Sequence, residues 1–248
     1  MGLLIGVAAR DGVVLGADRR FRSGFGGSGP YLDDCVCLRP YGDRAVIGYC
    51  GSRYAAKGVT MDAFLDSAER KYGTDVDVAE LPYLLHRHFN ESGCDDRNVE
   101  CVVGGIGSRD RFCLLITISL RLGFTLGQFN DSLNGSLCQG AHSIAKPILR
   151  GVGADYANWI GRNVEDAERA CRAALEASAV GYGLRKDCPI GGHLDLYVIR
   201  TNGRHGWLSD DGLSLMDQPV VMGRRIEKSA PPDAAEAAPD DDPFTVSP

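Results

Sequence analysis

Two aspartates stand out among the side chains that could take part in a reaction, because each lies at the edge of a well-defined segment. Asp18 follows the apolar run 13–17, and Asp187 lies shortly before the pair Gly191-Gly192. Both carboxylates also have a structural interpretation, since buried carboxylates are usually retained with hydrogen-bond partners such as loop amides. The paired glycines indicate a close approach of two backbone segments. No P-loop lysine follows them, so the sequence does not predict a phosphate-binding loop.

Two histidines and two cysteines form the other grouping that could carry chemistry, as metal ligands. His86 and His88 precede Cys94 and Cys101. Their spacing matches no standard zinc pattern. The two histidines are two positions apart on an expected helix, so they face different ways. The sequence therefore predicts no metal site here.

Three of the nine cysteines lie where a thiol could matter for function. Cys35 and Cys37 alternate along an expected strand, which predicts one thiol in the core and the other exposed. Cys188 lies between Asp187 and Pro189. A catalytic cysteine needs a nearby base and an electropositive setting, and the sequence identifies no such partner for Cys188.

The elements that would position these residues are strands in hairpins and three helices. Apolar runs separated by Asp-Gly or Asn-Gly turns predict strands at 3–9, 13–17, 34–38, 44–50, 99–106, 112–118, 193–200 and 204–209. Apolar residues at helical spacing predict helices from Ser52 to about residue 72, at 77–91 and at 163–181. Helices inserted between sets of strands favour an α+β class, a four-layer α-β-β-α sandwich.

Two stretches do not fit this regular order. Residues 120–148 are rich in Gly, Ser and Asn without a clean period, and are interpreted as an irregular insertion or long loop. Residues 228–248 consist mostly of Ala, Pro and Asp and are expected to form an acidic, disordered tail. One domain over residues 1–227 is therefore predicted.

Composition excludes several classes of function. Hydrophobic residues make up 44% and charged residues 24% of 248, as in ordinary globular proteins, and no apolar run is long enough to predict a transmembrane helix. Nine irregularly spaced cysteines without an export signal favour reduced thiols, in the cytoplasm or nucleus. The segment 229–248 accounts for five of the six net negative charges. No basic surface remains that would indicate nucleic-acid binding.

Four short motifs resemble those of β-type proteasome subunits, which are N-terminal-nucleophile hydrolases. They are residues 12–20 (GVVLGADRR), 47–51 (IGYCG), 151–157 (GVGADYA) and 185–192 (RKDCPIGG), in the family's order. The resemblance covers roughly residues 2–210, apart from 120–148. It implies that the α-β-β-α sandwich is the N-terminal-nucleophile hydrolase fold.

The resemblance also implies what catalysis would require. In active members, a threonine exposed as the first residue of the mature chain attacks the peptide carbonyl, and its own α-amine serves as the base. Only Asp18 and Asp187 match the family's catalytic pattern. The remaining positions hold residues unable to do this chemistry, namely Gly2 for the threonine, Asp34 for a supporting lysine, and Val152 and Ile190 for two supporting serines.

We therefore expect a non-catalytic structural subunit of the 20S core particle, with no catalytic, cofactor-binding or metal-binding residues and with other proteasome α and β subunits as partners. The start Met-x-x-Leu-Ile-Gly-Val is most similar to the β type-2 subunit at ring position four, which has no propeptide. The run 18–21 is instead similar to the β type-3 subunit. Residues 120–148 and the acidic tail match neither.

Two alternatives stay open. The chain could be a stand-alone hydrolase of the same fold that uses another nucleophile, such as Cys188 or a serine exposed by processing. It could also be a divergent paralogue that no longer assembles. The first residue of the mature chain separates the hydrolase from a structural subunit, because an N-terminal-nucleophile enzyme must begin at Thr, Ser or Cys.

Overall fold

The computed structural model describes most of the chain. The described residues are 2–23, 29–94, 99–107, 113–119, 125–130, 136–152, 162–183, 189–208 and 215–216. The expected tail, 228–248, lies outside them, as do Asp187 and Cys188.

The first sheet is antiparallel and has six strands among the described residues. It contains strand β2, which ends at Asp18, and strand β13, which follows the Gly191-Gly192 pair. Its order is β12-β1-β2-β13-β14-β15, and its bounds are β1 Leu3–Ala9, β2 Gly12–Asp18, β12 Ser136–Gly140, β13 Leu194–Arg200, β14 His205–Leu208 and β15 Leu215–Met216. The β1–β2 and β13–β14 hairpins turn at the predicted Asp-Gly and Asn-Gly positions. All seven residues of β1 are buried, because both faces of this sheet are covered.

A second antiparallel sheet, with five strands among the described residues, packs against the first. Its order is β11-β10-β9-β6-β5, with β5 Leu38–Tyr41, β6 Ala45–Cys50, β9 Glu100–Ile106, β10 Cys113–Ser119 and β11 Thr125–Asn130. Leu15 of β2 and Leu115 of β10 belong to the hydrophobic cluster between the sheets. Two small hairpins complete the strands, formed by β3 Phe21–Arg22 with β4 Tyr31–Leu32, and by β7 Tyr54–Ala56 with β8 Val59–Thr60.

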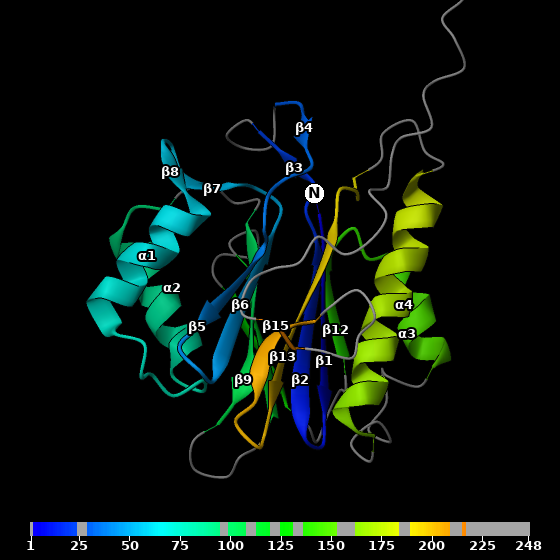
Figure 1. Cartoon of the computed structure of the whole chain (residues 1–248). Coiled ribbons are helices and arrows are strands. Elements are labelled where there is room, and N and C mark those ends of the chain that lie inside the picture. Colours follow the sequence, from blue (N-terminus) through cyan, green and yellow to red (C-terminus); the bar gives the residue numbers. More distant parts are fainter. Residues whose placement is uncertain are drawn as a thin grey trace, which may run out of the picture.

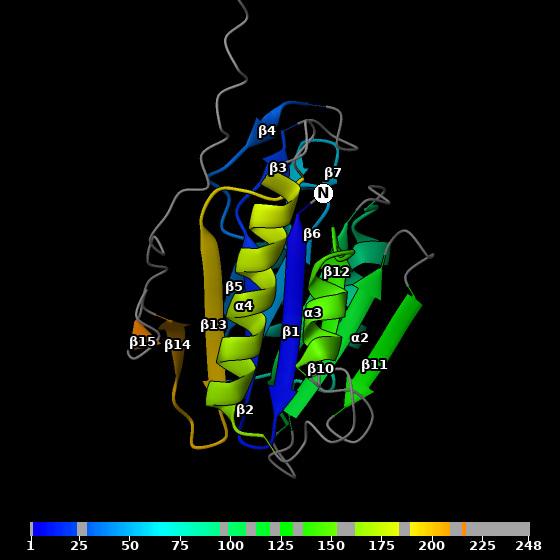
Figure 2. The same ribbon diagram turned by 90° about the vertical axis from the view of Figure 1, so that its right-hand side faces the viewer.

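Two pairs of helices lie on the outer faces of the sheets, as Figures 1 and 2 show. Helices α1 Met61–Tyr72 and α2 Leu81–Glu91 lie beside the second sheet, and α3 Ala145–Gly151 and α4 Val164–Gly183 beside the first. Phe64 and Phe89 stack with ring centroids 4.1 Å apart between α1 and α2. On the other side, Cys171 and Leu175 of α4 join the cluster that covers β1 and β2.

The mixed helix and strand class, with antiparallel sheets, is confirmed. The prediction that a helix begins at Ser52 is wrong, because residues 54–60 form the β7–β8 hairpin. Helix α1 begins at Met61. The Thr60 hydroxyl caps it by accepting the Ala63 N–H at 3.2 Å. The strand expected at 34–38 lies instead at Leu38–Tyr41. The stretch 120–148, which lacks a sequence period, contains β11, β12 and the start of α3 among its described residues.

Candidate functional site

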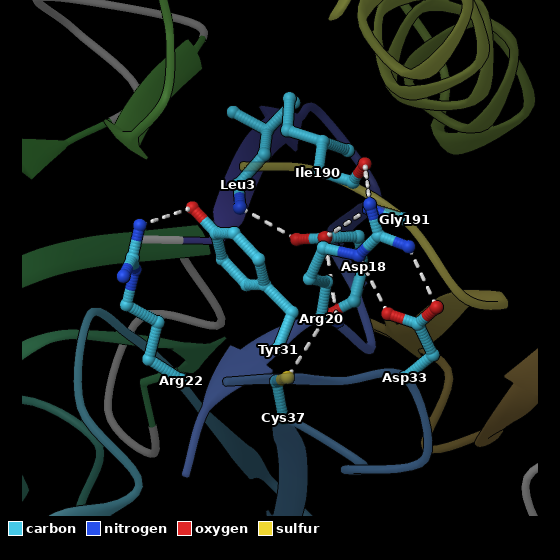
Figure 3. A network of polar contacts seen from close by, with 9 residues as sticks. All are labelled: Leu3, Asp18, Arg20, Arg22, Tyr31, Asp33, Cys37, Ile190 and Gly191. Carbon is cyan, nitrogen blue, oxygen red and sulfur yellow. Dashed lines mark hydrogen bonds and ion pairs between the residues drawn. The ribbon is translucent and has the colours of Figure 1, made fainter. Parts of the chain in front are cut away.

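The predicted site lies at the end of the first sheet where β1 begins and β2 ends, near the end marked N in Figure 1. Gly2 stands just before β1, Asp18 closes β2, and the segment 189–192 leads into β13. Figure 3 shows that these segments converge on one polar network. The first sheet positions all three, because β2 is paired to β1 on one side and to β13 on the other.

The Asp18 carboxylate is at the centre of this network and is only 1% exposed. Its Oδ1 accepts the Leu3 N–H at 2.6 Å, and its Oδ2 accepts the Gly191 N–H at 2.8 Å and the Arg20 N–H at 3.4 Å. Burial raises the pKa of Asp18 to about 7, although the three amide hydrogen bonds favour the ionised form. The prediction that this aspartate accepts hydrogen bonds from loop amides agrees with these contacts.

Arg20 supplies the cation of the site (Figure 3). Its guanidinium donates two hydrogen bonds to Asp33, at 2.5 and 2.6 Å, and a longer one of 3.4 Å to the Ile190 carbonyl. Such a bidentate pair fixes the guanidinium plane. The guanidinium lies against Gly191, where a Cβ would stand only 2.4 Å from Arg20 Cζ. The close backbone approach inferred from the paired glycines is present at Gly192, where a Cβ would stand 2.6 Å from the Asp33 carbonyl oxygen, whereas a side chain fills the space beside Gly191.

Gly2 occupies the position that the resemblance gives to the nucleophile. It is buried, and its carbonyl accepts the Ala141 N–H at 2.9 Å. A Cβ added to Gly2 would lie 2.9 Å from Asp18 Oδ1 and 3.3 Å from the Arg20 carbonyl oxygen. A larger residue here would have to displace a carboxylate that three amides hold in place.

The other predicted positions do not all meet at this site. Ile190 is buried and contributes its backbone carbonyl to the network. Asp34 is exposed, and its neighbour Asp33 pairs with Arg20 instead. Val152 is 45% exposed at the end of α3. Asp187 lies outside the described residues.

Arg20 and Asp33 form the ion pair at this site that the sequence did not predict. The signal available was the Arg-Arg pair directly after Asp18, since two adjacent arginines at a strand end need carboxylate partners if they are buried. Arg19 has such a partner as well, because its guanidinium forms a bidentate pair with Asp195 at 2.6 and 2.7 Å. That hydrogen-bonded carboxylate raises the pKa of Arg19.

Among the described residues, no lysine takes part in the network around Asp18. The lysines of the described part are Lys57, Lys71 and Lys146, and all three are exposed. An arginine stays protonated at any physiological pH, so Arg20 cannot exchange protons as a lysine amine can. The described residues therefore supply a fixed positive charge here rather than a titrating one.

Thiols of the described cysteines are mostly buried, and no disulfide joins them. The prediction that only one of Cys35 and Cys37 lies in the core is wrong, because both are buried, at 5% and 2% exposure. Strand alternation does not apply to them, since β5 begins only at Leu38. Cys37 Sγ donates to the Asp18 carbonyl at 2.9 Å, and burial raises the pKa of both thiols. Thiols in this state are poor nucleophiles.

A serine and a histidine approach each other between α1 and α2. Ser67 Oγ lies 2.6 Å from His88 Nε2 and 2.8 Å from the Phe64 carbonyl oxygen. Because one hydroxyl proton cannot serve both acceptors, the arrangement that satisfies the carbonyl has the ring donating to the hydroxyl. Burial lowers the pKa of His88. This contact is typical of a packed interior histidine, and no group of three possible metal ligands lies together in the described residues.

The backbone of β3, which follows the site in the chain, is already paired with another segment of the protein. Arg22 in β3 forms a parallel β-bridge with Ser52, and its guanidinium donates to the Tyr31 hydroxyl at 3.2 Å and lies 4.5 Å from the ring centroid. An extended peptide binds a sheet edge by using its unpaired N–H and C=O groups. A peptide could enter between residues 22 and 52 only by breaking this bridge.

Comparison with known proteins identifies the fold. No protein-family model matches the chain, and no curated protein matches it in sequence. Among solved structures, the helical assembly of the Anbu complex from Pseudomonas aeruginosa has a TM-score of 0.64 at 17% identity and covers 90% of this chain and 88% of that chain. Anbu (ancestral beta-subunit) from Yersinia bercovieri has a TM-score of 0.63 at 14% identity, covering 83% and 86%. The Anbu (Gly-1) mutant from Hyphomicrobium sp. strain MC1 has 0.62 at 17%, covering 83% and 84%.

These likenesses correct one prediction. The structural neighbours are Anbu proteins, a bacterial family related to the proteasome but distinct from it, and not a eukaryotic-type β type-2 subunit. The residues of the start Met-x-x-Leu-Ile-Gly-Val, which suggested type-2, form strand β1 from Leu3 onward, where the fold requires apolar side chains that can be buried. They therefore distinguish the fold better than the subunit.

The described helices do not meet the requirements of a membrane span. None of them is both long and apolar enough to cross a bilayer.

Proposed function

We propose that this chain is a non-catalytic subunit of a proteasome-related assembly built from several copies of itself. Two observations support the assembly. The fold is similar to that of Anbu proteins. One of these similar structures, from Pseudomonas aeruginosa, is a helical assembly of the Anbu complex. We also infer that the two sheets and their flanking helices (Figure 1) form the four-layer sandwich of N-terminal-nucleophile hydrolases.

Gly2 is the observation on which the non-catalytic role rests. Threonine chemistry needs a hydroxyl beside a free amine at this position, and glycine has no side chain. The direction in which a side chain would project is blocked by Asp18 Oδ1 at 2.9 Å. Loss of the nucleophile is thus accompanied by a geometry that disfavours any residue larger than glycine.

Arg20 supports the same proposal. Its guanidinium, bound to Asp33 and to the Ile190 carbonyl, fills the space beside Gly191 with a charge that does not titrate. The bridge between Arg22 and Ser52 uses the backbone groups that a peptide would need. Each of these features occupies space or backbone groups that a bound peptide would need. This suits a subunit that contributes to the wall of a particle and does not cleave peptides.

The experiment that tests this proposal is a gain-of-function substitution. A Gly2→Thr variant, with the threonine as first residue of the chain, is assayed against fluorogenic peptides and a peptide epoxyketone, with Gly2→Ala as the matched control for the steric effect. We expect no peptide turnover and no covalent adduct from either variant, and a similar loss of thermal stability in both. Turnover or an adduct specific to Gly2→Thr would contradict the proposal.

Native mass spectrometry of the wild-type chain tests the assembly separately. The proposal predicts particles containing several copies of this chain. A particle with proteasome α and β chains would support the hetero-oligomeric alternative, and a monomer would support a paralogue that does not assemble. A first residue of Ser, Thr or Cys would favour the stand-alone hydrolase. The cytoplasmic and nuclear location stays a prediction, which fractionation of the native cells would check.

A further inference from the structure

The end of the sandwich opposite the N mark in Figure 1 brings together four exposed arginines. They come from the β1–β2 turn, the β5–β6 turn, the residues before α4 and the β13–β14 turn, and are Arg10, Arg44, Arg162 and Arg204, here called the arginine cluster. The Arg10 N–H donates to the Arg162 carbonyl at 3.1 Å, and the Thr201 N–H donates to the Asp11 carbonyl at 2.9 Å. These bonds hold three of the four segments together.

A polar cavity of about 280 Å³ joins the β5–β6 turn to the others. Asp43 and Arg44 line it from that turn, and residues 200–203 line it from the β13–β14 turn. Ile106, at the end of β9, and Ile199, in β13, add apolar surface to the lining. A peptide that carries carboxylates can therefore contact both guanidinium groups and apolar side chains here.

The carboxylates at this end leave most of the arginine cluster without a partner. The Asp11 carboxylate accepts the N–H of the first residue of α4 at 2.8 Å, and that of Asp43 is 90% exposed and lies 3.7 Å from a histidine ring. The others lie in the first turns of α4 and pair with arginines outside the cluster, as Glu165 and Glu168 with Arg200 and Asp166 with Arg169. Arg10, Arg44 and Arg204 form no ion pair with a described residue.

We propose that the acidic segment 229–248 of the same chain docks on the arginine cluster and the cavity beside it. This segment has five carboxylates and no basic residue, and it lies outside the described residues. A guanidinium can donate two parallel hydrogen bonds to one carboxylate, so the charges of the two partners are complementary. The proposal does not depend on the non-catalytic role or on assembly.

Strand β15 directs the chain towards this end. It pairs antiparallel with β14, Met216 beside Trp207 and Leu215 beside Leu208, so the chain runs back towards the β13–β14 turn. That turn lies roughly 7 Å beyond Trp207, at a strand rise of about 3.3 Å per residue. The twelve residues 217–228 span at most about 40 Å. A segment tethered at this range has an effective concentration of roughly millimolar, which favours the segment of the same chain over that of a second copy.

Methyl NMR of the whole chain tests this docking, because the Ile106 and Ile199 methyl groups report on the cavity that they line. The wild type is compared with a neutral-segment variant that carries Asp233→Asn, Glu236→Gln, Asp240→Asn, Asp241→Asn and Asp242→Asn. We expect both resonances to differ between the two proteins at low salt. The difference should fall at least about fivefold at 1 M salt, where the Debye length is about 3 Å. The Ile190 methyl, at the other end of the sandwich, should not change.

Paired arginine variants locate the docking site. In a background of Arg44→Gln with Arg204→Gln, neutralising the segment should no longer shift the two methyl resonances. The matched control is Arg70→Gln with Arg87→Gln, which alters two exposed arginines of α1 and α2. In that background the shift should remain as large as in the wild type.

Four results would overturn the proposal. The first is identical Ile106 and Ile199 resonances in the wild type and the neutral-segment variant at low salt. The second is a difference that persists with Arg44→Gln and Arg204→Gln. The third is a difference that disappears on dilution, which would assign the site to the segment of a second copy. The fourth is equally tight binding of a duplex DNA oligonucleotide by both proteins, which would show that the segment does not occupy the arginine cluster.

Discussion

Asp18 and Asp195 are equally buried carboxylates on paired strands, one position apart in register, yet their surroundings differ. Asp195 receives both arms of the Arg19 guanidinium at 2.6 and 2.7 Å. Asp18 receives only backbone amides, and burial raises its pKa to about 7. Burial also raises the pKa of Asp195, although the hydrogen bonds from Arg19 oppose this rise. The difference between the two sites is therefore the guanidinium partner of Asp195, and not the burial that both carboxylates share.

Breaking the Arg19 pair should have the largest effect. Asp195→Asn leaves the guanidinium, which is only 10% exposed, without its counter-charge. Removal of one partner of a buried pair costs about 3–5 kcal/mol. Urea denaturation at pH 7 measures this change in the free energy of unfolding. A loss below about 1 kcal/mol would mean that the pair is not desolvated as the comparison requires.

Removing the Asp18 charge by Asp18→Asn should change the pH dependence of the free energy of unfolding more than its value at any one pH. Because the folded pKa of Asp18 lies above its unfolded value, its contribution is fully present below about pH 4 and is lost as the pH rises through about 7. Between pH 5 and pH 8 the wild type should lose roughly 2–3 kcal/mol more than Asp18→Asn does. Urea denaturation of both proteins at the two pH values measures this difference. Parallel pH profiles would show that burial does not raise the pKa of Asp18.

Weakening the partly exposed pair should have an intermediate effect. Arg20→Lys keeps the charge but loses the planar bidentate contact with Asp33, whose side chain is 29% exposed. We expect a loss of about 1 kcal/mol in thermal or chemical unfolding. Asp33→Asn removes the charge from the other side and should cost more than Arg20→Lys, because the Arg20 side chain is only 5% exposed and loses its counter-charge. An equal or smaller cost would contradict this account of the pair.

The smallest effect should come from an ion pair in solvent. Arg169, which is 71% exposed, pairs with Asp166 in the first turns of α4. Removal by Arg169→Gln should change the free energy of unfolding by less than about 0.5 kcal/mol, and this change should vanish at 1 M salt. A larger effect would indicate that this face of α4 is covered in the native particle.

Much of the fold was predictable from local patterns. The β1–β2 hairpin follows from apolar runs around Asp11-Gly12, and α4 from its helical stripe of buried residues. Residues 54–60 were misassigned because Ala55 and Val59 satisfy helical spacing, although they lie in the β7–β8 hairpin. Spacing alone cannot distinguish a short hairpin from the first turns of the helix that follows it.

The site was predictable only in part, for a physical reason. Asp18 could be identified because residues 12–20, which contain it, resemble a motif of β-type proteasome subunits. The partner of Arg20 could not, since the choice between Asp33 and Asp34 depends on which carboxylate the chain turns inward after β4. The sequence likewise could not show that Asp33 and Asp195 engage the two arginines adjacent to Asp18, which leaves the Asp18 carboxylate to the backbone amides of the described residues.

Native mass spectrometry of the chain isolated from its own cells, after incubation with a peptide epoxyketone, tests the proposed function most directly. We predict a particle that contains several copies of this chain, with no adduct and with a first residue other than Thr, Ser or Cys. A chain that begins at one of those residues and carries the epoxyketone would contradict a non-catalytic subunit and establish a working N-terminal nucleophile.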